Sequence, residues 1–277
     1  MRRLFQLKSR KILAGPYLFW AVSFIIIPLL MILYYGLTDK NGSFTLNNLA
    51  QMTTPENLKA LGLALLLSFI STVICLILAY PLAMILAEKN INQTSFIVLI
   101  FILPMWMNFL LRTLAWQTLL EKNGVINSIL SFLHLPQQSI INTPAAIVLG
   151  MVYNFLPFMV LPIYNVLSKI DKDVIHAAKD LGANNVQTFL KIIMPLSIPG
   201  IISGITMVFV PSLTTFVISD LLGGSKILLI GNVIEQEFKQ GSNWNAGSGL
   251  SLVLMLFIIA SMALIAKYDK NGEGNTF

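Results

Sequence analysis

The chain has 277 residues, of which 56% are hydrophobic and only 11% are charged, and its formal net charge is +6. A soluble domain carries far more charge than this, so the composition excludes a soluble globular protein. The chain is therefore predicted to be an integral membrane protein.

Apolar runs long enough to cross a membrane recur along the sequence. A helix needs about 20 apolar residues to cross a hydrocarbon core of ~30 Å. Six runs meet this requirement and predict an all-α fold within one transmembrane domain, residues 1–277. The expected spans are about 12–37, 60–87, 93–118, 145–167, 197–219 and 246–266.

Basic residues are distributed unevenly between the two sides of these spans. Lys and Arg in short loops stay on the cytoplasmic side of a membrane. An N-terminus inside places twelve of them in the cytoplasm: Arg2, Arg3, Lys8, Arg10, Lys11, Lys89, Lys169, Lys172, Lys179, Lys191, Lys267 and Lys270. Five lie outside: Lys40, Lys59, Lys122, Lys226 and Lys239. Both termini are therefore predicted to be cytoplasmic, and the positive charge is a topology signal rather than a sign of nucleic-acid binding.

The largest predicted cytoplasmic element, 168–195, lies between the fourth and fifth spans. Asp173 can cap a helix over 174–181, because an Asp side chain accepts hydrogen bonds from the free amides of a first helical turn. Gly182 can supply the left-handed residue that ends this helix. The pattern predicts a short helix that lies outside the membrane.

A second helix is expected in the same element. Asn184 or Asn185 can start it, and it is predicted to cover 186–194 before the chain enters the membrane. In the first helix, Ala177 and Ala178 carry little side-chain bulk, so another protein can approach the backbone closely. These features favour a docking surface for a soluble partner over a catalytic centre.

The spacing of these small residues resembles the EAA loop of ABC importer permeases. The motif consists of Ala177-Ala178, three residues, Gly182, nine residues, Ile192, one residue and Met194-Pro195. The resemblance implies that the loop forms the coupling helix, which sits in a cleft of the ATPase subunit. The residues implied in this coupling are Asp173, His176, Ala177, Ala178 and Gly182.

The sequence departs from the family at the first letter of the motif, where His176 replaces Glu. If Asp173 is the cap, His176 stands at the third helical position, where a Glu reaches back to the cap amide. A neutral His loses part of this stabilisation, an effect of about 0.5 to 1 kcal/mol. We expect a weakened helix that still forms.

The resemblance extends over nearly the whole chain, to the B-type permeases of spermidine/putrescine importers. It is carried by Pro104-Met-Trp106-Met-Asn108 with Arg112, Val152-Tyr153, Leu156 to Val160, Ser219-Asp220-Leu221 with Gly223-Gly224, and Leu228 to Ile234. The resemblance implies a bacterial inner-membrane complex with a second, C-type permease as a heterodimer, a pair of ATPases and an extracytoplasmic polyamine-binding protein. ATP and Mg²⁺ belong to the ATPases, and this chain is expected to bind no cofactor.

A polyamine needs carboxylates, carbonyl oxygens or aromatic faces to cross a membrane protein. Trp106, Tyr153 and Tyr164 lie in the third and fourth predicted spans and are candidates for the substrate pathway, with packing or interface anchoring as the alternative for each ring. Nearby prolines are expected to kink these spans and free backbone carbonyls toward a cavity. They are Pro104, Pro157 and Pro162.

Polar groups complete the candidate pathway. Asn108 lies in the same segment as Trp106. Asp220 is predicted to end the fifth span at its outer edge, where its carboxylate can meet the cation. The alternative is that Asp220 is a solvated charge or contacts a partner protein. Arg112 repels a polyamine, so it is expected to extend outward or to pair with a carboxylate such as Glu121.

Other motifs in the sequence indicate structure rather than chemistry. Gly200 and Gly204 form a GxxxG pair, which predicts a close helix contact within the fold or with the partner permease. Gly223 to Lys226 lacks the spacing of a phosphate-binding loop. His134 and His176 are too far apart in the topology to share a metal, so no metal site is expected.

A secondary transporter and a membrane enzyme are two alternatives to a subunit of an ATP-driven transporter. A secondary transporter is expected to have repeated halves and ionisable residues in mid-membrane. A membrane enzyme is expected to place a nucleophile with a base, or a metal set, on one side of the membrane. The sequence has neither pattern, and a related importer for another small solute is the nearer alternative.

Overall fold

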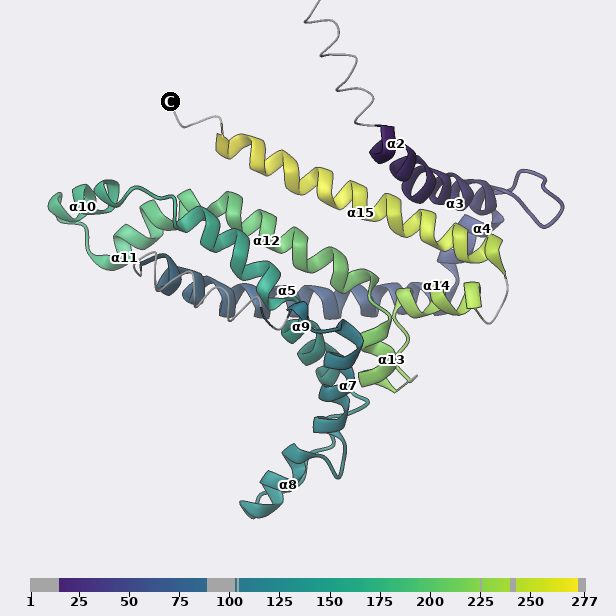
Figure 1. The fold of residues 1–277 in the computed structure, drawn as a ribbon, viewed down its shortest axis with the longest axis horizontal. Coiled ribbons are helices and arrows are strands. Elements are labelled where there is room, and N and C mark those ends of the chain that lie inside the picture. The colour runs from purple at the N-terminus through teal and green to yellow at the C-terminus, as the bar shows by residue number, and fades with distance from the viewer. Residues whose placement is uncertain (1–14, 89–102, 104, 225, 240–242, 274–277) are drawn as a thin grey trace, which may run out of the picture. The chain divides into compact units, whose positions relative to one another are not determined.

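The computed structural model describes residues 15–88, 103, 105–224, 226–239 and 243–273 (Figure 1). The described chain is helical almost throughout, with one isolated antiparallel bridge between Thr38 and Phe44. The helices are α2 (Gly15–Ala21), η1 (Val22–Ile26), α3 (Ile27–Leu37), α4 (Asn47–Ala50), η2 (Gln51–Thr53), α5 (Pro55–Glu88), α7 (Phe109–Leu120), α8 (Val125–Phe132), α9 (Pro144–Leu167), α10 (Lys172–Asp180), α11 (Asn185–Thr188), η3 (Phe189–Ile193), α12 (Met194–Thr214), α13 (Val217–Gly223), α14 (Ile230–Lys239) and α15 (Trp244–Glu273).

Helices of membrane-spanning length recur through the described residues. Five are long and apolar enough to cross a bilayer: Gly15–Leu37, Pro55–Glu88, Pro144–Leu167, Asn185–Thr214 and Trp244–Leu264. They overlap five of the six predicted spans. Much of the third predicted span, 93–118, lies outside the described residues, and its described C-terminal part is α7.

The chain forms two compact units. The first comprises Met1–Leu58 and Ile234–Phe257, and the second comprises Lys59–Val233 and Ile258–Phe277. Each unit is built from segments that are distant in the sequence.

In the first unit, two asparagine side chains hold the C-terminal end of α3. The last carbonyls of a helix have no partner within the helix. Asn48 donates to the carbonyl of Thr38 at 2.8 Å, and Asn245 donates to those of Thr38 at 2.6 Å and Tyr35 at 3.1 Å. Residues about 200 positions apart therefore meet at one helix end.

In the second unit, α9 and α12 run side by side (Figure 1). A Cβ at Gly200 of α12 would lie 2.9 Å from the carbonyl oxygen of Pro162, and one at Gly204 would lie 2.6 Å from the sulfur of Met159. Only glycine permits this distance between the helices. The close helix contact predicted from the GxxxG pair is therefore confirmed, and it lies within the fold.

The fifth predicted span, 197–219, is wrong at its C-terminal end. The helix ends at Thr214, and Thr215 has an extended backbone with φ −66° and ψ 138°. The separate helix α13 then packs against α9, where Gly150 leaves room for the side chains of Ile218 and Leu222. No charged residue lies between Lys191 and Asp220, so the length of the uncharged run does not reveal this turn.

Candidate functional site

The loop between α9 and α12, residues 168–193 and hereafter the α10 loop, begins with a capped helix. The N-cap of α10 is Asp171, whose Oδ1 accepts from the backbone amide of Asp173 at 2.9 Å. The prediction that Asp173 is the cap is wrong. The backbone is already extended at Asp171, so the earlier carboxylate reaches the free amides, and Asp173 instead places its charge in the first turn, where the helix dipole favours it.

This shift also changes the role of His176. With Asp171 as the cap, the third helical residue is Val174, and His176 lies further along the helix. The expected loss of capping energy at His176 therefore does not apply. His176 is exposed on α10, where its side chain is accessible to a partner.

The end of α10 is a Schellman motif. The amide of Gly182 donates to the carbonyl of Lys179 at 2.9 Å, and that of Ala183 donates to the carbonyl of Ala178 at 3.0 Å. Gly182 has φ +85°, which confirms the prediction that a left-handed glycine ends this helix. A Cβ at Gly182 would meet nothing within 4 Å, so the space beside it is open.

The two alanines of the motif face different ways. Ala178 is buried, whereas Ala177 is exposed, so only one of them contributes to the outer surface. Beside Gly182, the side chain of Leu181 is 90% exposed. The accessible surface of α10 therefore combines small residues with one fully projecting apolar side chain, a feature that the motif spacing alone did not indicate.

The second half of the α10 loop begins with a capping box. Asn184 Oδ1 accepts from the amide of Gln187 at 2.8 Å, and Gln187 Oε1 accepts from the amide of Asn184 at 3.0 Å. This confirms Asn184, of the two predicted candidates, as the start. The predicted 186–194 helix does not end at Met194, because α11, η3 and α12 form one helix from Asn185 to Thr214.

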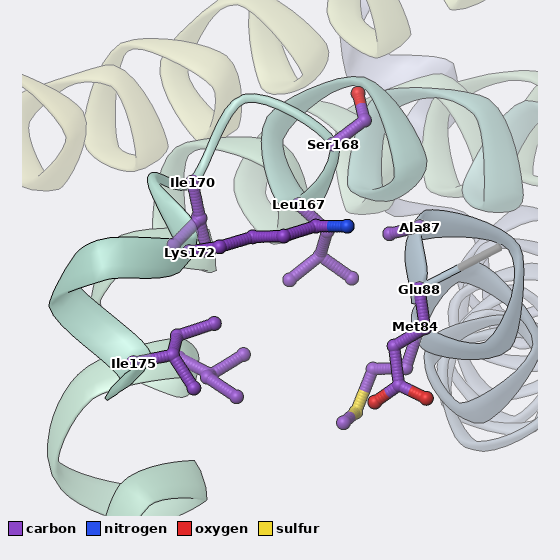
Figure 2. Close-up of a pocket in the computed structure, with 9 residues that line it drawn as sticks. Met84, Ala87, Glu88, Leu167, Ser168, Ile170, Lys172 and Ile175 are labelled. Carbon is purple, nitrogen blue, oxygen red and sulfur yellow. The ribbon is translucent and has the colours of Figure 1, made fainter. Parts of the chain in front are cut away.

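A pocket lies between α10 and the ends of α5 and α9 (Figure 2). Its cavity volume is about 80 Å³, and apolar side chains such as those of Met84 and Ile175 line it. Lys172 extends its ammonium group across the pocket toward the end of α5, where Glu88 lies (Figure 2). The pocket leaves unfilled space beneath α10.

The first pathway candidates lie where the third predicted span is interrupted. Asn108 is the N-cap of α7, and its Oδ1 accepts from the amides of Leu110 at 2.8 Å and Leu111 at 3.3 Å. The predicted span over 93–118 is therefore interrupted at Asn108, where the backbone is not helical. Trp106, just before this break, has a side chain that is 74% exposed.

The structure brings an unpredicted tryptophan to one of the predicted tyrosines. The rings of Trp116 on α7 and Tyr153 on α9 make an edge contact with centroids 5.3 Å apart. Tyr153 is 39% exposed. Tyr164 lies three helical turns further along α9, about 16 Å away at 1.5 Å per residue, so it does not join this pair. Trp116 could not be predicted as a site residue from the sequence, because its contact with Tyr153 depends on how α7 packs on α9.

Asp220 lies in α13 within a hydrogen-bonded network, hereafter the Asp220 turn, residues 216–224 and 226–232. Asn232 Nδ2 donates to Asp220 Oδ1 at 2.6 Å and to the carbonyl of Phe216 at 3.1 Å. Asn232 Oδ1 accepts from the amide of Leu229 at 3.0 Å and from the hydroxyl of Ser219 at 2.5 Å. Asp220 therefore does not end the fifth span, and it is hydrogen-bonded to a buried amide.

Arg112 does not extend outward as predicted. Its side chain is only 7% exposed, and neither Nε nor Nη1 has a hydrogen-bond partner in the part of the chain that the structure describes. The suggested partner, Glu121, is the C-cap residue of the same helix and is exposed. The helix that carries Arg112, α7, packs against α13 and α9. Within the described residues, no three His, Cys, Asp or Glu side chains are grouped to hold a metal ion.

A comparison with protein families places the chain. Residues 79–270 match the family described as "Binding-protein-dependent transport system inner membrane component". The chain belongs to this family. As a binding-protein-dependent transport component it is a multi-pass protein of the inner membrane, and its role is transport rather than enzymatic catalysis.

Similar proteins of this transport family cover almost the full length of the chain. It is 36% identical over 264 residues to the spermidine/putrescine transport system permease protein PotB of Haemophilus influenzae, covering 91% of this chain and 92% of that protein. It is 37% identical to PotB of Escherichia coli strain K12, and the match covers 89% of this chain and 92% of that protein. It is 28% identical over 277 residues to the E. coli inner membrane ABC transporter permease protein YdcU.

Solved structures agree with the fold. A chain of a bacterial alginate ABC transporter, crystallised with an alginate pentasaccharide-bound periplasmic protein, matches with a TM-score of 0.75 at 16% identity. The match covers 95% of this chain and 93% of that chain. The fold is therefore the all-α fold of a type I ABC importer permease, as predicted from the sequence.

Proposed function

We propose that this chain is the transmembrane permease subunit of an ATP-driven importer for polyamines. The observation that carries the proposal is the identity of 36–37% to PotB permeases over about nine-tenths of the chain. The region that matches the family, residues 79–270, includes both the α10 loop and the Asp220 turn. The substrate class is a cation with two or more ammonium groups, such as putrescine or spermidine.

The α10 loop is the proposed contact with the ATPase. Its helix is capped at both ends, which fixes its length and direction without a partner. Leu181 projects from the surface beside the open space at Gly182, so an apolar pocket on the partner can enclose it. His176, Ala177 and Gly182 complete this contact, with Asp173 in the first turn and Ala178 packing inward.

The proposed substrate pathway uses residues of the second unit. Tyr153, joined by Trp116, offers aromatic faces to an ammonium group, and Asp220 offers a carboxylate. Trp106 is exposed at the break in the third span. Asn108 holds that break in place through its cap, and Tyr164 belongs to a separate, later part of the path on α9.

The proposed assembly follows from the function. It contains this chain, a C-type permease as the other half of a heterodimer, two ATPase subunits that bind ATP and Mg²⁺, and an extracytoplasmic polyamine-binding protein. The α10 loop and both termini face the cytoplasm, in agreement with the distribution of basic residues. This chain itself binds no cofactor.

The experiment is uptake of radiolabelled spermidine and putrescine into proteoliposomes that hold this chain with its co-purifying partners. We expect uptake that requires both ATP and the binding protein, and that stops when the ATPase is inactivated. Uptake driven by an ion gradient without ATP would instead indicate a secondary transporter. ATP hydrolysis stimulated by another binding protein, without polyamine uptake, would support the permease role and show that the proposed substrate is wrong.

A further inference from the structure

The side-chain amide of Asn232 has only one orientation that satisfies its neighbours. The backbone amide of Leu229 can only donate, and the backbone carbonyl of Phe216 can only accept. The first lies 3.0 Å from Oδ1 and the second 3.1 Å from Nδ2. The amide nitrogen must therefore be the atom that lies 2.6 Å from Asp220 Oδ1.

The surroundings make this orientation rigid. Asn232 is fully buried, and Ser219 places its hydroxyl 2.5 Å from Oδ1. The network joins α13 to the first turn of α14. Neither end of the Asn232 amide can rotate without leaving a buried polar group unpaired, which is costly inside a protein.

We propose that Asn232 is the positioning residue that holds the Asp220 carboxylate charged and fixed for the ammonium groups of the substrate. This inference rests on the proposed function, in which Asp220 meets a polyamine. A buried amide donor favours the charged form of the carboxylate that it contacts. Asp220 is half-buried, so it combines this support with access to a cation.

Asn232 acts through Asp220 and does not itself need to touch the substrate. Ser219 supports it from the same helix as Asp220, so the three residues form one unit. A role limited to joining α13 and α14 would affect assembly and ATP hydrolysis as much as transport. A positioning role affects the number of polyamine molecules moved for each ATP hydrolysed.

The test uses the complete transporter in proteoliposomes, with radiolabelled putrescine and spermidine as probes. Uptake and binding-protein-stimulated ATP hydrolysis are measured together for Asp220→Asn, Asn232→Leu and Ser219→Ala. Loss of a hydrogen bond to a charged group predicts that Asn232→Leu lowers polyamine uptake per ATP roughly ten-fold, while hydrolysis continues. Ser219→Ala, which leaves the Asn232 side chain in place, is expected to have a smaller effect in the same direction.

A swap variant tests the pair directly. Asn232→Asp places two carboxylates in contact and is expected to reduce uptake, because like charges cannot both remain ionised at this distance. Combining Asp220→Asn with Asn232→Asp returns one carboxylate and one amide to the pair. Uptake per ATP in the double variant should stay low, because a carboxylate at position 232 is fully buried and faces the carbonyl of Phe216. Normal uptake per ATP in the double variant would show that the position of the carboxylate does not matter and would overturn the positioning role.

Asn127 provides a matched control for structural damage. It is also buried, and it accepts from the amide of Gln138 at 2.9 Å and donates to the carbonyl of Glu121 at 3.3 Å. Asn127→Leu therefore breaks a similar clamp away from Asp220. It is expected to leave uptake per ATP unchanged, even if less complex is recovered.

The outcomes separate this inference from the proposed function. If Asp220→Asn lowers uptake per ATP but Ser219→Ala and Asn232→Leu do not, the positioning role is wrong and the pathway role of Asp220 stands. If the Asp220→Asn variant has the same polyamine uptake per ATP as the unaltered protein, Asp220 is not part of the pathway, and this inference is wrong as well. If no polyamine is transported by the unaltered complex, the proposed substrate itself is wrong.

Discussion

The α10 loop and the Asp220 turn are both polar interruptions between long apolar helices, yet they are built in different ways. The hydrogen bonds that shape the α10 loop join residues at most five positions apart, as in the Asp171 cap, the Gly182 motif and the Asn184 box. The Asp220 turn depends on contacts across 12 to 16 positions that centre on one buried amide. Local bonds leave the surface of the α10 loop exposed, which suits docking to another protein. The longer contacts bury the amide and hold a carboxylate in a fixed place, which suits a site for a small cation.

The largest effect is expected at Gly182, which ends the helix of the α10 loop. Gly182→Leu forces a branched side chain into a left-handed backbone, at a cost of about 1 to 2 kcal/mol, and also fills the open space beside Leu181. Coupled uptake in proteoliposomes should fall to background while membrane insertion is unchanged. Gly182→Asn, which tolerates this backbone, should keep part of the activity. Gly62→Leu is the matched control, because Gly62 also faces open space but lacks a positive φ.

Leu181 tests whether the exposed surface of the α10 loop is a docking surface. Burying a leucine side chain contributes about 1.5 to 3 kcal/mol, so Leu181→Ala should weaken ATPase association roughly ten- to hundred-fold. Titration of the purified ATPase subunit onto the detergent-solubilised permease measures this. Leu181→Met keeps the apolar bulk and should bind nearly normally. Equal binding by all three forms would remove Leu181 from the interface.

Trp116 tests whether a site formed by two packed helices contributes to the pathway near the Asp220 turn. A cation over an aromatic face contributes about 0.5 to 2 kcal/mol, so Trp116→Leu should lower spermidine uptake per ATP roughly 2- to 30-fold. Trp116→Phe keeps a ring beside Tyr153 and should lose less. If the Leu and Phe variants transport equally well, the ring packs against Tyr153 without meeting the substrate.

Arg112 should show the smallest effect. Nε and Nη1 of the buried Arg112 side chain have no hydrogen-bond partner among the described residues, and burying polar groups without partners is costly, so an apolar side chain of similar length should be tolerated or stabilising. Arg112→Met should therefore unfold at the same temperature as the unaltered protein, or slightly higher, when the isolated chain is heated in detergent. A clear drop in unfolding temperature would show that Arg112 has a stabilising acceptor. Arg112→Lys, which retains a charge, serves as the comparison.

Sequence patterns predicted the α10 loop well because its signals are local. The glycine stop and the Asn184 start each depend on a few neighbouring residues, and both were confirmed. The error at the start of the first helix, Asp173 for Asp171, arose because two acidic residues stand within one turn and either can cap a helix. The choice between them depended on where the chain leaves α9.

The interruptions inside the third and fifth predicted spans could not be found in this way. The break at Asn108 lies in the uncharged run 90–111, and the turn after Thr214 lies in the uncharged run 192–219, so no charged residue marks either one. The contacts of Trp116 with Tyr153 and of Asn232 with Asp220 form only after the chain has turned. Arg112 was expected at the surface because an isolated helix offers no way to bury it.

The sequence by itself determined that this protein lies in a membrane, roughly where most of its long apolar helices run, and that a capped helix with a glycine stop separates the fourth and fifth of them. These properties follow from the length of apolar runs and from hydrogen bonds between near neighbours. Only the tertiary structure decided that α9 and α12 meet through Gly200 and Gly204, and that Asp220 is held by a buried amide. The reason is physical: such contacts depend on which helix faces meet, and apolar faces of equal hydrophobicity do not specify their partners in advance.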